Sequence, residues 1–83
     1  MDSEYKNIEK EVVRIISKIA KVSDEDVNPK GGFSEIGIDS FDSLEVIFAV
    51  ENKYNITFSQ ENLMIKTVED LVKLTKQLLE KNG

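Results

Sequence analysis

The sequence contains no cysteine and no histidine. Without cysteine the chain cannot form a disulfide, a thiolate nucleophile or a cysteine-ligated zinc site. Without histidine it lacks the commonest general base and metal ligand. Its carboxylates are spread along the chain rather than grouped in one motif, which does not favour a catalytic pocket. We therefore predict no catalytic residue, no metal ligand set and no enzymatic activity.

Long apolar runs are missing as well. No run approaches the roughly 20 apolar residues that a membrane span needs, so no stable membrane insertion is expected. Residues 1–5 are acidic and lack the form of a signal peptide, which makes the cytoplasm the default location. The length of 83 residues predicts one domain, spanning residues 1–83, and we expect a monomer.

The net charge of −5 is spread unevenly. Residues 22–70 carry eleven acids and three bases, a net charge of −8, whereas both flanking segments are slightly positive. A negative field of this kind repels nucleic acid and attracts basic partners. Residues 1–21 also contain a basic stripe at i, i+4 spacing: Lys6, Lys10, Arg14 and Lys18. This stripe is either a solvated face or a contact for a membrane or an acidic partner.

One acidic segment imitates a calcium-binding loop. Asp24, Asp26, Asn28 and Glu35 stand at the first, third, fifth and twelfth positions of the EF-hand pattern. Pro29 occupies the position at which that loop requires glycine, so no calcium site is expected.

Apolar periodicity predicts an all-α fold, a small four-helix bundle with three long helices and one short one. The long helices are expected over residues 3–20, over residues 40–54 and after Thr67, which is a candidate N-cap. The short helix is expected between residues 59 and 65. A long connection, residues 21–38, joins the first two helices and should be pinned to the bundle by its apolar side chains: Val22, Val27, Phe33, Ile36 and Ile38.

The helix predicted over residues 40–54 carries two apolar stripes. At 100° per residue, one stripe reads as the core face: Ser43, Val46, Ile47, Val50 and Tyr54. A second stripe lies almost opposite and is flanked by acids: Phe41, Leu44 and Phe48, with Asp42, Glu45 and Glu51 beside them. Exposed apolar residues rimmed by charge often mark a partner surface. The alternative is that a neighbouring loop covers Phe41 or Phe48.

The start of this helix combines three local signals. Gly37 suits a backbone conformation that a side chain would strain, Asp39 is a strong N-cap candidate, and Ser40 then becomes the first helical residue. Unpaired N–H groups give a helix start partial positive charge, so a serine there can carry a phosphate group.

The pattern Gly37-Ile38-Asp39-Ser40-Phe41, with Glu45 and Tyr54 at their spacings, resembles the acyl carrier protein family from Ile8 to Leu79. The resemblance implies that Ser40 carries 4′-phosphopantetheine covalently and that Asp39 helps a phosphopantetheinyl transferase to engage the serine. It implies docking of synthetases and synthases, through their basic patches, on Phe41, Asp42, Leu44, Glu45, Phe48 and Glu51. It also implies an acyl pocket lined by Val46, Ile47, Val50, Tyr54, Ile65 and Leu71.

Some features depart from the family pattern. Phe41 follows the serine where leucine is usual, the segment around Glu61 is poor in acids, and the first helix is basic. These departures concern the partners more than the attachment chemistry. They favour a dedicated pathway of lipid or polyketide synthesis, while fatty acid biosynthesis is also open.

Three alternatives remain open at this point. The chain is either an acyl carrier or an aminoacyl or peptidyl carrier, or it is an unmodified adaptor that binds a partner through Phe41, Leu44 and Phe48. The literal family motif, Asp42-Ser43-Leu44, also makes Ser43 a rival attachment site. If Ser43 were the attachment site, Gly37 would lie six residues before the serine instead of three, and Tyr54 would lie eleven residues after it instead of fourteen. Ser40 is therefore favoured.

Overall fold

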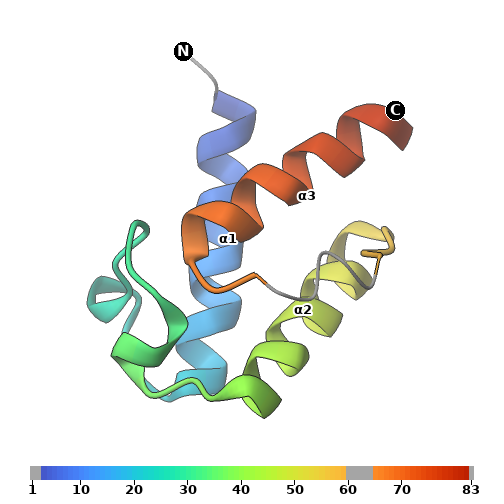
Figure 1. Ribbon diagram of the computed structural model, residues 1–83. Coiled ribbons are helices and arrows are strands. Elements are labelled where there is room, and N and C mark those ends of the chain that lie inside the picture. The colour runs from blue at the N-terminus through green and yellow to red at the C-terminus, as the bar shows by residue number, and fades with distance from the viewer. Residues whose placement is uncertain (1–2, 60–64, 83) are drawn as a thin grey trace.

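The computed structural model describes residues 3–59 and 65–82, and these residues contain three α-helices and two short 3-10 helices (Figure 1). In chain order the elements are α1 (Ser3–Ala20), η1 (Asp24–Asp26), η2 (Phe33–Ile36), α2 (Ser40–Tyr54) and α3 (Val68–Asn82). The predictions of three long helices and of an all-α fold are therefore confirmed. The short helix predicted between residues 59 and 65 falls mostly outside the described residues.

Helix α1 is the element against which the other two long helices pack. Figure 1 shows α3 crossing α1, with α2 to one side and the connection that contains η1 and η2 to the other. The core lies between the three helices and consists of the stripes predicted from periodicity. Its fully enclosed apolar members are Val12, Ile16, Val46, Ile47, Val50, Val68, Leu71 and Val72.

The connection between α1 and α2 is held down by buried apolar side chains, as predicted, with Val27, Phe33 and Ile38 in the core. The two 3-10 helices within it were not predicted, because elements of three or four residues are too short to show periodicity. An isolated antiparallel bridge between Gly32 and Thr67 ties this connection to the segment before α3. The connection is therefore fixed against the segment that leads into α3.

The helix ends follow local chemistry. Thr67 caps α3 as predicted, since its Oγ1 accepts the backbone N–H of Asp70 at 3.1 Å. Lys21 and Asn55 follow α1 and α2 in the left-handed region, with φ of 61° and 55°. Asparagine tolerates this conformation better than lysine does. Each such residue stops its helix and turns the chain away from the axis.

We expect Val50→Ala to destabilise the fold by about 1–3 kcal/mol, because Val50 is fully buried and truncation leaves a cavity. Phe48→Ala should cost clearly less, since the Phe48 side chain is 53% exposed. Denaturant titrations of both variants measure the difference. If Phe48→Ala were the less stable of the two, the assignment of the two faces of α2 would be wrong.

Candidate functional site

The site begins in the turn between η2 and α2. Gly37 has φ of 83°, a left-handed conformation that glycine adopts without strain. Space does not require the glycine, because a Cβ built on it would meet no atom within 4 Å. The next residue, Ile38, is buried and donates its N–H to the carbonyl of Phe33 at 3.1 Å. The turn is thus anchored in the core immediately before α2 starts.

Asp39 is the N-cap of α2, as predicted. Its Oδ1 accepts the backbone N–H of Asp42 at 2.8 Å, and its carbonyl accepts that of Ser43 at 2.9 Å. The carboxylate is therefore turned onto the helix. The N–H groups of Ser40 and Phe41 have no acceptor within the helix, because no helical carbonyl lies four residues before them. They therefore leave partial positive charge at the start of α2.

The two candidate serines differ in exposure and in hydrogen bonding. Ser40 is exposed, and its hydroxyl forms no hydrogen bond with the described residues. Ser43 is half-buried and donates its hydroxyl to the carbonyl of Ser40 at 2.8 Å. The hydroxyl of Ser40 is therefore the more available of the two.

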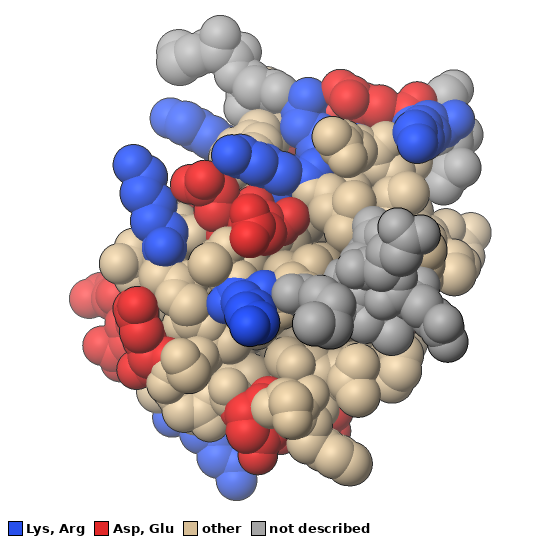
Figure 2. Space-filling model, viewed as in Figure 1, with Lys and Arg blue, Asp and Glu red and all other residues tan. Residues whose placement is uncertain are grey.

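A cleft of about 450 Å³ opens beside Ser40. Its walls come from the connection, from the start of α2 and from the segment before α3: Phe33, Ser34, Ile38, Asp39, Ser40, Ser43, Ile65 and Lys66. Figure 2 shows acidic side chains beside the start of α2, in the lower part of the molecule. Sequence reasoning missed Phe33, Ile38 and Lys66 as lining residues of this cleft. Phe33 and Lys66 are distant in sequence and meet beside the bridge between Gly32 and Thr67, whereas Ile38 was assigned only to the core.

The residues predicted to line an acyl pocket fall into two groups. Val46, Ile47, Val50 and Leu71 are fully enclosed in the core, whereas Tyr54 and Ile65 are half-buried. Of these six residues only Ile65 lines the cleft beside Ser40. Burial, and then the charge of Glu11, raise the pKa of Tyr54, so its phenol stays neutral. The acyl pocket remains a prediction.

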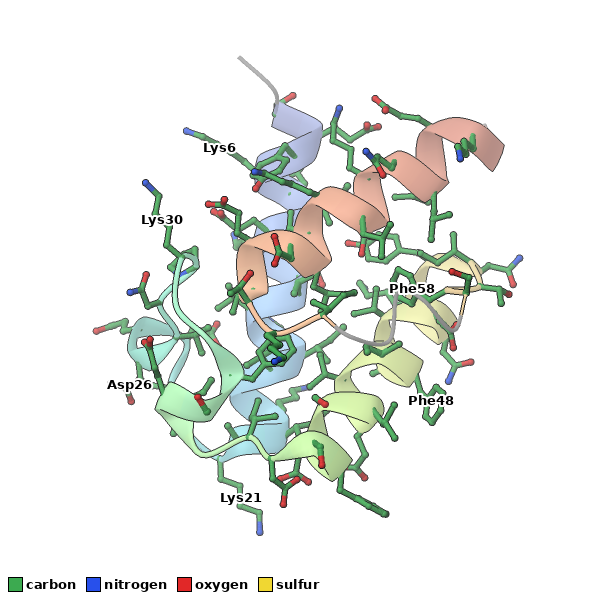
Figure 3. All side chains as sticks on the ribbon, viewed as in Figure 1. Lys6, Lys21, Asp26, Lys30, Phe48 and Phe58 are labelled. Carbon is green, nitrogen blue, oxygen red and sulfur yellow. The ribbon has the colours of Figure 1, made fainter. Side chains whose placement is uncertain are left out.

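The second stripe of α2 is largely exposed. Phe41 and Phe48 are 73% and 53% exposed, which contradicts the alternative in which a loop covers them. Figure 3 shows Phe48 pointing away from the bundle. Leu44 is half-buried. The three side chains are thus available in different degrees to a partner, and their role in binding one remains a prediction.

The acids beside this stripe are not equivalent. Glu45 is exposed and Asp42 is half-buried. Glu51 is also half-buried, and its Oε2 accepts the backbone N–H of Phe58 at 2.7 Å. This bond fastens the chain after α2 and helps to place Phe58 in the core. Glu51 therefore has a structural role that was not predicted.

Two acids of the connection between α1 and α2 accept hydrogen bonds from serine hydroxyls of the same chain. Asp24 accepts a hydrogen bond from Ser17, and Asp26 accepts one from the hydroxyl of Ser23 at 3.0 Å. In the part of the chain that the structure describes, no three acidic residues gather as a metal site would require.

The basic stripe of α1 is exposed, and its four side chains make no ion pair with described residues.

The geometry defines a small helical protein with an exposed serine at a helix start, and comparison with known proteins shows its family. The family described as "Phosphopantetheine attachment site" matches residues 10–75. Acyl carrier protein 4, chloroplastic, of Cuphea lanceolata is 36% identical over 74 residues, covering 87% of this chain and 53% of the relative. An acyl carrier protein homolog of Mycoplasmopsis pulmonis is 38% identical over 64 residues, covering 76% of this chain and 88% of the relative.

Solved structures extend the match to the fold. The crystal structure of an acyl carrier protein from Thermotoga maritima superposes with a TM-score of 0.84 at 26% identity, covering 96% of this chain and 95% of the other. The chain therefore belongs to the acyl carrier protein family, whose members carry covalent 4′-phosphopantetheine. It spans about half the length of the Cuphea relative. No described helix is both long and apolar enough to cross a membrane.

The residues around Ser40 fit this group. The serine is exposed at a helix start, which favours a phosphate. The adjoining cleft offers apolar side chains, Phe33, Ile38 and Ile65, and one basic residue, Lys66. An arm with a phosphate at one end and a largely neutral chain beyond it matches both properties.

We expect Glu51→Gln to lower the free energy of unfolding by about 1 kcal/mol, the usual difference between a hydrogen bond to a charged group and one to a neutral group. The loss arises because the glutamine carbonyl oxygen can still accept the N–H of Phe58, but without the negative charge that strengthens the present bond. Glu45→Gln is the matched control, since Glu45 is exposed, and it should change stability little. Equal stability of the two variants in urea titrations would remove the structural role of Glu51.

Proposed function

We propose that this chain carries an acyl group as a thioester on a 4′-phosphopantetheine arm attached to Ser40. The observation that carries the proposal is the exposed hydroxyl of Ser40 at the start of α2, beside a cleft of about 450 Å³. The family match over residues 10–75 supports it, because it includes this segment. The whole of residues 1–83 then acts as one carrier domain.

Attachment requires a transferase and a coenzyme A donor. The Ser40 oxygen forms a bond to phosphorus, the bond from phosphorus to the nucleotide part of the donor breaks, and the serine proton passes to a base. The chain has no histidine, and the Asp39 carboxylate is engaged with the N–H of Asp42. We expect the transferase to supply the base, and this chain then acts as its substrate rather than as an enzyme.

The partners we propose are a phosphopantetheinyl transferase and synthetases or synthases with basic docking patches. Phe41 and Phe48 offer exposed apolar area on α2, and Glu45 offers exposed negative charge beside them. Apolar anchors give contact area, and complementary charge speeds encounter. The pathway is fatty acid synthesis or a dedicated lipid or polyketide pathway, in the cytoplasm.

We expect Ser40→Ala to abolish the mass increment that a transferase and coenzyme A add to the protein. Ser43→Ala should keep the increment, because the Ser43 hydroxyl is already bonded to the carbonyl of Ser40. Intact mass spectrometry of both variants, with circular dichroism as a check of folding, decides between the serines. The reverse pattern would assign the arm to Ser43, and a wild type that gains no mass would favour the unmodified adaptor.

Charge reversal at Glu45 tests the docking surface. Glu45→Lys should slow modification by the transferase, and the effect should shrink as salt is added, because screening weakens exposed charges. Glu25→Lys is the control, since Glu25 is also an exposed acid but belongs to η1 rather than to α2. The measurement is the initial rate of mass gain at low and high ionic strength. Equal slowing by both variants would mean that net charge alone matters.

A further inference from the structure

The cleft beside Ser40 has one basic side chain on its described walls. Asp39 and Lys66 are the charged residues among those that line it. The Asp39 carboxylate is engaged with the N–H of Asp42 at 2.8 Å. Lys66 forms no ion pair and no side-chain hydrogen bond with any described residue. Its ammonium is therefore available to a negatively charged group in the cleft.

The backbone of Lys66 is fixed in place. The N–H of Phe33 donates to the Lys66 carbonyl at 3.0 Å. On the other side of the bridge between Gly32 and Thr67, the N–H of Val68 donates to the carbonyl of Gly31 at 3.3 Å. The lysine side chain thus extends from a fixed point on the cleft wall.

A phosphodiester on Ser40 would stand among acids. Asp39 and Asp42 flank it in the cap and the first turn of α2, and Glu45 follows further along the same helix. Like charges repel, and the free N–H groups of the helix start offset only part of that repulsion. A lysine ammonium is a usual partner of phosphate and forms stronger, charge-assisted hydrogen bonds.

We propose that Lys66 is a phosphate-binding residue, whose ammonium pairs with the phosphodiester that joins the arm to Ser40 and so holds the arm along the cleft. The proposal rests on attachment of the arm at Ser40. Lys66 is exposed, so the pairing is screened by salt. Arginine also binds phosphate and should replace lysine here.

The experiment compares four holo proteins: wild type, Lys66→Gln, Lys66→Arg and Lys30→Gln. Lys30 is the matched control, because it is an exposed lysine that does not line the cleft. Intact mass and peptide mapping first establish that each protein carries the arm on Ser40. Phosphorus-31 NMR then gives the chemical shift and linewidth of the phosphodiester at low and high salt.

In Lys66→Gln we expect a shifted and narrower phosphorus resonance at low salt, since the phosphodiester has lost its partner and moves more freely. Lys30→Gln should match the wild type, and Lys66→Arg should keep a broad phosphorus resonance that depends on salt, because it keeps a positive partner for the phosphodiester. High salt should move the wild-type resonance toward that of Lys66→Gln. We expect Lys66→Gln to fold like the wild type, because the Lys66 carbonyl that accepts the N–H of Phe33 belongs to the backbone.

Two results would overturn the proposal. One is a phosphorus resonance in Lys66→Gln identical to that of the wild type at low salt. The other is an equal change in Lys30→Gln, which would mean that the resonance reports only net charge. Neither result bears on the attachment of the arm to Ser40. If that attachment were wrong, peptide mapping of the wild type would find no added mass on Ser40.

Discussion

Helix α2 has to bury one side and expose the other, and the rest of the structure depends on this division. Val46, Ile47 and Val50 are fully enclosed, because α1 and α3 supply the remaining walls of the core. Phe41 and Phe48 remain largely in water. Burying a phenylalanine contributes about 1.5–3 kcal/mol. This small protein lacks much of that stabilisation at two positions of one helix. Binding of a partner to the exposed rings would account for it.

The same division places Ser40 at the border between core and solvent. Ile38 is buried, and Ser40, two residues later, is exposed. Just before them Gly37, with φ of 83°, ends η2 and turns the chain toward the start of α2. The cleft arises because the connection and the segment before α3 meet at the bridge between Gly32 and Thr67. Two loops, rather than the helices alone, therefore form the surroundings of the candidate attachment site.

The helices and their caps could be predicted because they depend on neighbours in sequence. Periodicity located all three long helices, and the residue types of Asp39 and Thr67 located two of their starts. The cleft could not be predicted, because Phe33 and Lys66 lie 33 positions apart and meet only in the folded chain. A helical wheel shows on which side of α2 Glu51 lies. It cannot show that Glu51 accepts the N–H of Phe58, because Phe58 lies seven residues later and beyond the end of the helix. Its role therefore looked purely electrostatic from sequence.

The electrostatics of the site combine two opposite requirements. Recognition by basic partners favours acids on α2, whereas a phosphodiester at the start of the same helix favours positive charge. The chain separates the two in space. Glu45 is exposed on the helix itself, while Lys66 belongs to a different segment, bound to the connection by the N–H of Phe33. A positive group supplied from outside α2 can offset the charge of a bound phosphate without removing the acids that a partner would recognise.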